Sequence, residues 1–167
     1  MVPVTIESVR VSLVSQHRLI VLREQGSNRY LPIWIGAFEA EAITIRLQGA
    51  TLARPMTHDL LQRCIGQLGG EVLRVVVSDL RQETFFANIY VRRNGEELAI
   101  DARPSDAVAL AVRADVPIFV ADTVMELASI EPDASAWLDG SKEQAGAEDI
   151  SVFRDFIDSL DLGDLEG

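Results

Sequence analysis

The sequence predicts an α+β fold: a mixed, largely antiparallel sheet of hairpins with helices packed on it, plus a C-terminal amphipathic helix. Three observations lead to this class. Short apolar runs are separated by turn-forming residues, which is typical of strands joined as hairpins. Other segments repeat their apolar residues at helical spacing. Strands and helices are interspersed without regular strand–helix–strand repeats, which favours α+β over a parallel α/β sheet.

The first half of the chain predicts strands, then helices. Three apolar segments with polar turns between them are expected to be strands: residues 4–13, 18–24 and 30–36. Pro32 suits a sheet edge or the start of a strand, because proline cannot donate to the ladder. A helix follows over 37–49 and ends at Gly49. Residues 54–70 predict a second helix, with Thr57 as its N-cap. Its expected apolar stripe consists of Leu60, Leu61, Cys64, Ile65 and Leu68.

The second half predicts two hairpin strands around 79–83, a third strand at 94–101, and a helix opened by Pro104 and Ser105. A buried strand and a short helix are expected at 116–120 and 121–130. We expect one domain over 1–130, a linker over 131–147, and an acidic amphipathic helix or tail over 148–167.

Composition indicates a globular protein of the cytoplasm. The chain has 167 residues, of which 48% are hydrophobic and 25% charged, which excludes a disordered class. No apolar run approaches the roughly 20 residues that span a bilayer, and the N-terminus lacks the pattern of a signal peptide, so no membrane partner is expected. The single cysteine, Cys64, is expected to be buried and reduced. Trp34 is expected in the core and His17 in an exposed turn.

The net charge of −11 is unevenly distributed. From Glu131 onward, eleven acidic residues face Lys142 and Arg154, which gives 2 − 11 = −9. The remaining chain carries −11 − (−9) = −2 and contains thirteen arginines. Arginine favours bidentate contacts with carboxylate and phosphate. The alternative is compositional, because a chain rich in Ala, Arg and Val is also typical of a GC-rich coding sequence.

Two Arg-Pro motifs precede helices and carry the polar residues of most interest. Each motif continues with a hydroxyl and an aspartate: Arg54, Pro55, Thr57 and Asp59 in the first, and Arg103, Pro104, Ser105 and Asp106 in the second. This pattern is typical of a helix N-terminus, where proline, a capping hydroxyl and an acid are all favourable. Alternatively, an arginine beside Asp101 forms a structural ion pair that locks strand to helix.

A third interpretation gives these motifs a chemical role. Two helix N-termini and two arginines form an anion site for phosphate, bound by Arg54, Arg103, Thr57 and Ser105. Asp59, Asp101 and Asp106 supply carboxylates for Mg²⁺ or Mn²⁺, and His58 serves as a base or ligand. In residues 36–47, Glu39 and Glu41 face different directions of a helix, so one can enter a cleft while the other is solvated. Spacing alone does not decide between these interpretations.

The motifs resemble those of a known family. The segments LPIWIGAFEAEAI, RPMTHDLL and DARPSDAVALAVRADVPIFV are similar, in this order, to the bifunctional nuclease family, formerly a domain of unknown function. The similarity spans residues 4–128. Some bacterial members end in a UvrB/UvrC-like motif, whereas this chain ends in an acidic segment. The resemblance implies an α+β domain with deoxyribonuclease and ribonuclease activity.

The leading hypothesis is therefore a nuclease that hydrolyses phosphodiester bonds of DNA and RNA with the help of Mg²⁺ or Mn²⁺. In this hypothesis the catalytic residues are His58, Asp59, Asp101 and Asp106. Arg54, Thr57, Arg103 and Ser105 bind substrate, and Glu39, Asp101 and Asp106 hold the metal. The alternative is a non-catalytic homo-oligomeric or regulatory domain in which the Arg–Asp motifs are structural. A homo-oligomer is expected in either case, because strand edges and an apolar-faced helix invite pairing.

Overall fold

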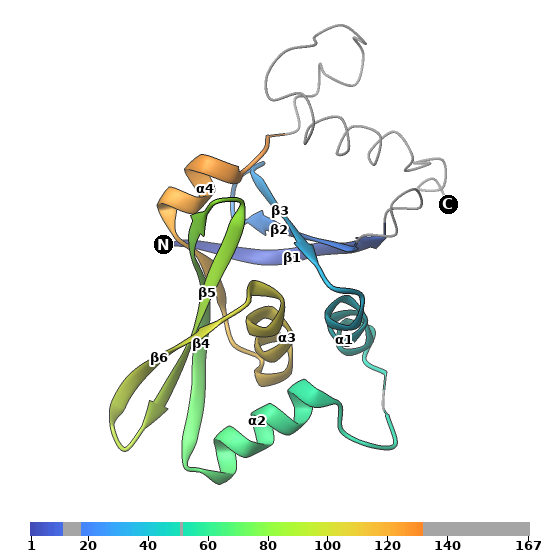
Figure 1. Ribbon diagram of the computed structural model, residues 1–167, viewed down its shortest axis with the longest axis vertical. Coiled ribbons are helices and arrows are strands. Elements are labelled where there is room, and N and C mark those ends of the chain that lie inside the picture. The colour runs from blue at the N-terminus through green and yellow to red at the C-terminus, as the bar shows by residue number, and fades with distance from the viewer. Residues whose placement is uncertain (12–17, 51, 132–167) are drawn as a thin grey trace, which may run out of the picture.

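The structure is a computed structural model that describes residues 1–11, 18–50 and 52–131. The described residues form seven strands and four helices, which confirms the α+β class (Figure 1). In chain order they are β1 (Val2–Val11), β2 (Arg18–Glu24), β3 (Tyr30–Ile35), α1 (Ala37–Leu47), α2 (Thr57–Gln67), β4 (Gly70–Arg81), β5 (Thr84–Arg93), β6 (Glu96–Ala102), α3 (Pro104–Ala114), β7 (Ile118–Val120) and α4 (Asp122–Ala128). The linker and helix expected over 131–167, and His17, lie outside the described residues, apart from Glu131.

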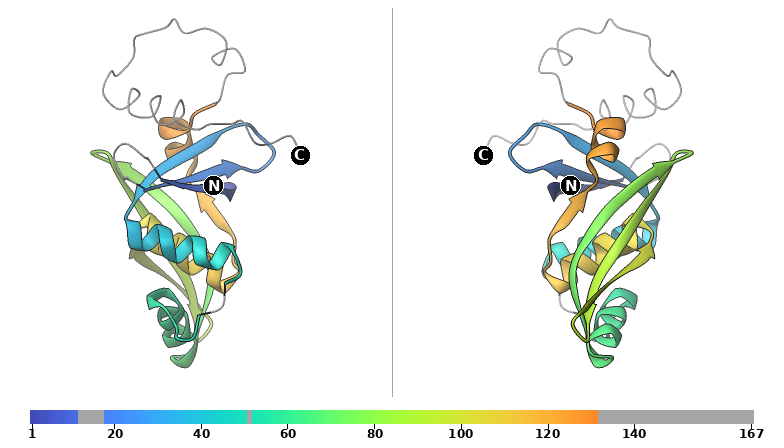
Figure 2. Two further views of the ribbon diagram at one scale, coloured as in Figure 1. Left: turned by 90° about the vertical axis from the view of Figure 1, so that its right-hand side faces the viewer. Right: turned by 90° about the vertical axis from the view of Figure 1, so that its left-hand side faces the viewer.

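One mixed sheet contains all the described strands, in the order β3-β2-β1-β7-β4-β5-β6. Only the β4–β7 pair is parallel, and the other neighbours are antiparallel. Short β7 joins two antiparallel units, β1–β3 and β4–β6, and the sheet is strongly curled (Figure 2). Pro32 lies on β3, which is an edge strand as the sequence predicts. The predicted mixed, largely antiparallel sheet is thus confirmed.

The central helix α3 positions the polar residues discussed below. Its middle, residues 107–112, is wholly apolar, as expected of a buried helix, and Val108, Ala109 and Leu110 are fully buried. It contacts α1 and α2 as well as β4 and β5. Arg103 at its N-cap and Arg113 in its last turn therefore emerge beside the other two helices. The hydrophobic core links α3 to apolar residues of the sheet and of α4.

Several local expectations are wrong. Thr57 does not cap α2: Met56 is the N-cap residue, and the Asp59 side chain accepts the Met56 backbone N–H at 2.8 Å. Similarly Arg103, not Ser105, is the N-cap residue of α3, because Pro104 already takes the first helical position. Trp34 and Cys64 are exposed rather than buried.

The expected apolar stripe of α2 is also wrong, except for Ile65, which packs against the core. Leu60, Leu61 and Leu68 are exposed. The inner face instead carries buried His58 and half-buried Gln62 and Ile65 at the i, i+4, i+7 spacing. His58 and Gln62 face inward because α3 offers hydrogen-bonding partners, Asp106 and the Arg113 carbonyl. Among the described helices, none is long and apolar enough to cross a membrane.

Candidate active site

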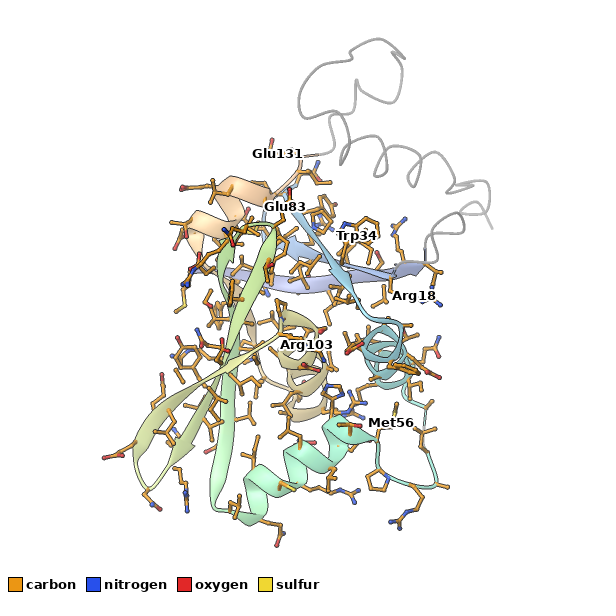
Figure 3. All side chains as sticks on the ribbon, in the orientation of Figure 1. Arg18, Trp34, Met56, Glu83, Arg103 and Glu131 are labelled. Atoms are coloured by element: carbon orange, nitrogen blue, oxygen red, sulfur yellow. The ribbon has the colours of Figure 1, made fainter. Side chains whose placement is uncertain are left out.

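Arg103 is the centre of a polar cluster where α1 and α3 begin. Its Nε donates to Asp106 Oδ2 at 2.8 Å, and its Nη2 donates to Glu39 Oε1 at 2.8 Å. The backbone of Arg103 is extended, as the following proline favours. Its side chain therefore contacts Asp106 in the first turn of α3 and also reaches Glu39 of α1. Although two carboxylates bind it, the Arg103 side chain remains 67% exposed. The guanidinium is therefore fixed in direction while part of it faces solvent (Figure 3).

His58 joins the cluster from α2. Its Nε2 lies 3.0 Å from Asp106 Oδ1, so the Asp106 carboxylate binds Arg103 with one oxygen and His58 with the other. His58 is only 7% exposed, and its buried Nδ1 has no hydrogen-bond partner among the described residues. When the neutral ring donates through Nε2 to the carboxylate, Nδ1 keeps an unprotonated lone pair. Glu39, His58, Arg103 and Asp106 are called the Arg103 cluster below.

Electrostatics favour the ionised forms of Asp106 and Arg103. Burial alone raises the pKa of Asp106, but hydrogen bonds from Arg103 and His58 outweigh it and hold that pKa below its ordinary value. The same contact with Asp106, followed by the contact with Glu39, raises the pKa of Arg103. Asp106 is therefore a carboxylate at neutral pH, so it acts as a hydrogen-bond acceptor and orients its two partners.

A second ion pair joins Asp59, the residue after His58 on α2, to Arg113 on α3. Arg113 Nε donates to Asp59 Oδ1 at 2.7 Å, while Asp59 Oδ2 accepts the Met56 N–H. Burial raises the pKa of Asp59, but the hydrogen bonds from Met56 and Arg113 lower it overall. Since both oxygens are engaged, Asp59 fastens the start of α2 to the end of α3. Asp59 thereby holds its neighbour His58 against Asp106.

The structure brings some of the sequence candidates together and leaves others apart. Glu39, His58 and Asp106 gather on Arg103, with Asp59 beside them. Asp101 is exposed on β6, where it pairs with Asn88 of β5, and its side chain makes no hydrogen bond or ion pair with another described residue. The remaining candidates are Arg54, exposed on the loop before α2, Thr57 and Glu41, both exposed, and Ser105, which is buried.

The expected metal ligands were tested against this geometry. Of the three, Glu39 and Asp106 both bind Arg103, whereas Asp101 stands apart. Within residues 1–11, 18–50 and 52–131, no three His, Cys, Asp or Glu side chains are grouped so that they could hold a metal ion. The arrangement of donors therefore does not fit a divalent cation unless Arg103 releases its carboxylates.

Comparison with known proteins identifies the family. A model of the bifunctional nuclease domain matches residues 20–133. The chain belongs to the bifunctional nuclease domain family. The match contains all four members of the Arg103 cluster. An uncharacterized protein of Mycobacterium tuberculosis is 39% identical over 165 residues, which cover 98% of this chain and 97% of the relative.

Two plant relatives in the family carry a functional name. Bifunctional nuclease 2 of Arabidopsis thaliana is 32% identical over 108 residues, or 62% of this chain and 33% of the plant protein. Bifunctional nuclease 2 of Oryza sativa subsp. japonica is 34% identical over 105 residues, or 60% of this chain and 32% of the plant protein. The matched region thus spans about a third of each plant nuclease.

One structural residue of this bifunctional nuclease domain was missed by sequence reasoning. The Arg113 side chain is 2% exposed, and it donates to the Ala109 and Ala42 carbonyls as well as to Asp59. It connects α1, α2 and α3 below the Arg103 cluster. The sequence does contain a signal for a buried arginine. Arg113 lies seven residues after Asp106 and four after Ala109, so the three residues share one face of a helix whose middle is apolar.

Proposed function

We propose that this chain is a nuclease that hydrolyses phosphodiester bonds in DNA and RNA at the Arg103 cluster. The observation that supports it most is the guanidinium of Arg103, held by two carboxylates and still largely exposed. Its free N–H groups can bind the non-bridging oxygens of a phosphodiester in the forked geometry that arginine favours. The family and the names of the plant relatives agree with this chemistry.

Each member of the cluster has a role in the proposal. Arg103 binds the scissile phosphate and stabilises the charge that builds up when the nucleophile attacks. Glu39 and Asp106 fix the guanidinium, so less ordering is required during the reaction. His58, oriented by Asp106, accepts a proton at Nδ1. The proton comes from the water that attacks phosphorus; the bond from phosphorus to the leaving sugar oxygen breaks, and that oxygen takes a proton from solvent. Because Nδ1 is buried in the free protein, the side chains around the ring must move to let the attacking water reach it.

Divalent metal assistance stays a prediction. Glu39 and Asp106 would hold the ion, which would polarise the phosphodiester as a Lewis acid. Both carboxylates bind Arg103, so we derive no step of the reaction through a metal.

The test is a matched pair of aspartate variants on one helix. Asp106→Asn removes the carboxylate that orients Arg103 and His58, whereas Asp115→Asn makes the same charge change at the far end of α3. Asn tolerates the left-handed backbone of Asp115, which has φ of 55°. With extensively purified proteins, we expect cleavage of labelled DNA and RNA to fall about 100-fold or more in the first variant only. Equal residual activity in both variants and the wild type would mean a contaminating nuclease and would contradict the proposal.

The alternative, a non-catalytic homo-oligomeric domain, is favoured by one observation. Strand β6 is an edge of the sheet, and Leu98 and Ile100 on it are each 45% exposed. They pair with buried Val91 and Ile89 of β5, so they extend the apolar face of the sheet into solvent. An exposed apolar edge strand is suited to pairing with a second chain. Self-association through β6 is compatible with a nuclease, and it is tested separately below.

A further inference from the structure

A groove next to the Arg103 cluster gathers arginines without matching acids. It lies between the end of α1, residues 49–50 and 52–56 of the following loop and the first half of α2, with a volume of about 510 Å³. Its lining contains four arginines and one acidic residue: Arg46, Arg54, Arg63 and Arg113 with Asp59. These side chains sum to 4 − 1 = +3 in a chain whose net charge is −11. We call this hollow the arginine groove.

Three of the four guanidinium groups have no carboxylate partner. Arg113 is matched with Asp59. The side chains of Arg54 and Arg63 form no ion pair or hydrogen bond with any other described residue, although Arg63 attracts the Asp59 carboxylate electrostatically. The Arg46 side chain forms one hydrogen bond, from Nε to the Val112 carbonyl at 3.2 Å. Elsewhere in the described chain, ion pairs occupy Arg23, Arg29, Arg74, Arg81, Arg92 and Arg103. Arg10 and Arg93 also form no ion pair with a described residue, but neither lines this hollow. Three guanidinium groups without an ion pair therefore share one hollow.

The chemistry of the groove suits a chain of phosphates. Like charges that face one hollow repel each other until an anion lies between them, so a ligand with several negative charges is favoured over a single carboxylate. Apolar Leu52 and Pro55 lie between the arginines and can contact sugars and bases. A nucleic-acid strand offers this combination of a repeating anion and an apolar body.

The position of the groove links it to the proposed reaction. Met56 and Asp59 line it, and they belong to the same turn of α2 as His58. In Figure 3, Arg103 is labelled at the start of α3, in the Arg103 cluster, and Met56 at the start of α2, beside the arginine groove. Arg103 and Arg113 are ten positions apart along α3, which is about 15 Å at ~1.5 Å per residue. A stacked strand rises ~3.4 Å per nucleotide, so about four nucleotides cover this distance.

From this arrangement we infer that the arginine groove binds the phosphate backbone of a nucleic-acid strand, about four nucleotides from the phosphate held by Arg103. The inference rests on the proposed function, because it takes nucleic acid as the substrate and the Arg103 cluster as the reacting end. Arg46, Arg54 and Arg63 bind substrate and take no part in bond cleavage. The groove makes binding dependent on strand length and not on base sequence.

Salt dependence of binding tests the groove directly. The full chain is titrated against a labelled, single-stranded phosphorothioate 20-mer and against the corresponding trinucleotide, by fluorescence anisotropy over a range of salt concentrations. The slope of log affinity against log salt is negative, and each lost phosphate contact reduces its magnitude by about 0.7 for a single strand. The triple variant Arg46→Gln/Arg54→Gln/Arg63→Gln is expected to reduce the magnitude of the slope for the 20-mer by about 2 and to leave trinucleotide binding unchanged.

Matched variants guard against a general effect of charge or folding. Arg81→Gln/Arg92→Gln/Arg93→Gln removes the same charge from exposed positions of β4 and β5 and is expected to keep the slope within about 0.5 of the wild type. If the groove triple does not fold, Arg54→Gln/Arg63→Gln suffices, because neither side chain forms a hydrogen bond or ion pair with a described residue, and its expected slope change is about 1.4.

Two readouts separate failure of the groove from failure of the proposed function. With a cleavable strand, the groove triple is expected to raise KM while kcat at saturating strand stays within about twofold, since uniform binding alone is lost. An unchanged KM and a slope equal to that of the control triple would overturn the groove and leave the nuclease standing. If the groove triple shows the expected reduction of the salt slope but no protein, wild type included, cleaves the strand, the groove stands and the nuclease is rejected. Equal weakening of trinucleotide and 20-mer, or no binding by the wild type, would also overturn the inference.

Discussion

Substitution of the buried arginine Arg113 by methionine tests how the three helices are held together. The change removes four donated hydrogen bonds: those to Asp59 Oδ1 and to the Ala109 and Ala42 carbonyls, at 2.7, 2.8 and 3.1 Å, and a weaker one to Met56 Sδ at 3.9 Å. Breaking a buried ion pair by removing one partner costs about 3–5 kcal/mol. Methionine still fills most of the space, and Asp59 keeps its bond to the Met56 N–H, so we expect the lower end, ~3 kcal/mol.

Urea denaturation measures this cost. With an m-value of ~2 kcal/mol/M, a loss of ~3 kcal/mol moves the unfolding midpoint down by about 1.5 M. Arg63→Met is the matched control, because Arg63 lines the same groove but is exposed and its side chain forms no ion pair or hydrogen bond with a described residue, and its effect is expected within ~0.5 kcal/mol. The double variant with Asp59→Asn is expected to lose less than the sum of the single losses, since the two side chains share one interaction. A midpoint shift no larger than that of the control would refute the view that Arg113 holds α1, α2 and α3 together.

Three further predictions concern acid, metal and assembly. The pKa values of Asp59 and Asp106 are lowered in the folded state, so their contribution to stability is complete above pH ~4 and is lost as pH falls through the folded values. Urea midpoints from pH 7 to pH 3 should therefore fall less steeply for Asp59→Asn than for the wild type, and parallel curves would contradict this. Chelation with EDTA tests the metal prediction: loss of cleavage that Mg²⁺ or Mn²⁺ restores would support it, whereas full activity in EDTA would agree with the arrangement of donors around Arg103 and show that the metal prediction is wrong. Size-exclusion chromatography should find an oligomer that the double variant Leu98→Glu/Ile100→Lys converts to a monomer, whereas identical elution of the two proteins would reject pairing through β6.

Local patterns in the sequence were sufficient to predict most elements but not their order in the sheet. Alternation and turn residues predict the two antiparallel units, because neighbouring strands in these units are also neighbours in sequence. The insertion of β7 between β1 and β4 depends on contacts between residues far apart in the chain, such as Val2 with Val120. No local periodicity encodes that pairing.

The polar residues show the same limit. Glu39, His58, Arg103 and Asp106 were all candidates from sequence, but their assembly depends on α1 and α2 packing against α3. Asp101 was grouped with them because it is close in sequence to Arg103. It belongs to the strand β6, whose seven residues are exposed or half-buried. Proximity in sequence across a strand end therefore did not predict proximity in space.

The inner face of α2 was mispredicted for a physical reason. Hydrophobic periodicity selects Leu61 and Leu68, since it assumes that apolar residues face inward. In the structure, α3 carries polar groups at both ends, and His58 and Gln62 turn inward to meet them. The leucines are left exposed. A polar interior that connects helices is specified by tertiary partners, which a single helix does not display.

The single-turnover rate of phosphodiester cleavage by Arg103→Gln tests the central claim most directly. At saturating protein, this rate reports the chemical step and is insensitive to weaker substrate binding. Because the guanidinium is assigned to the charge that develops in the transition state, we predict a rate about 100-fold to 1000-fold below the wild type, with the arginine groove still binding the strand. A wild-type rate in Arg103→Gln would contradict the assignment of the Arg103 cluster as the active site.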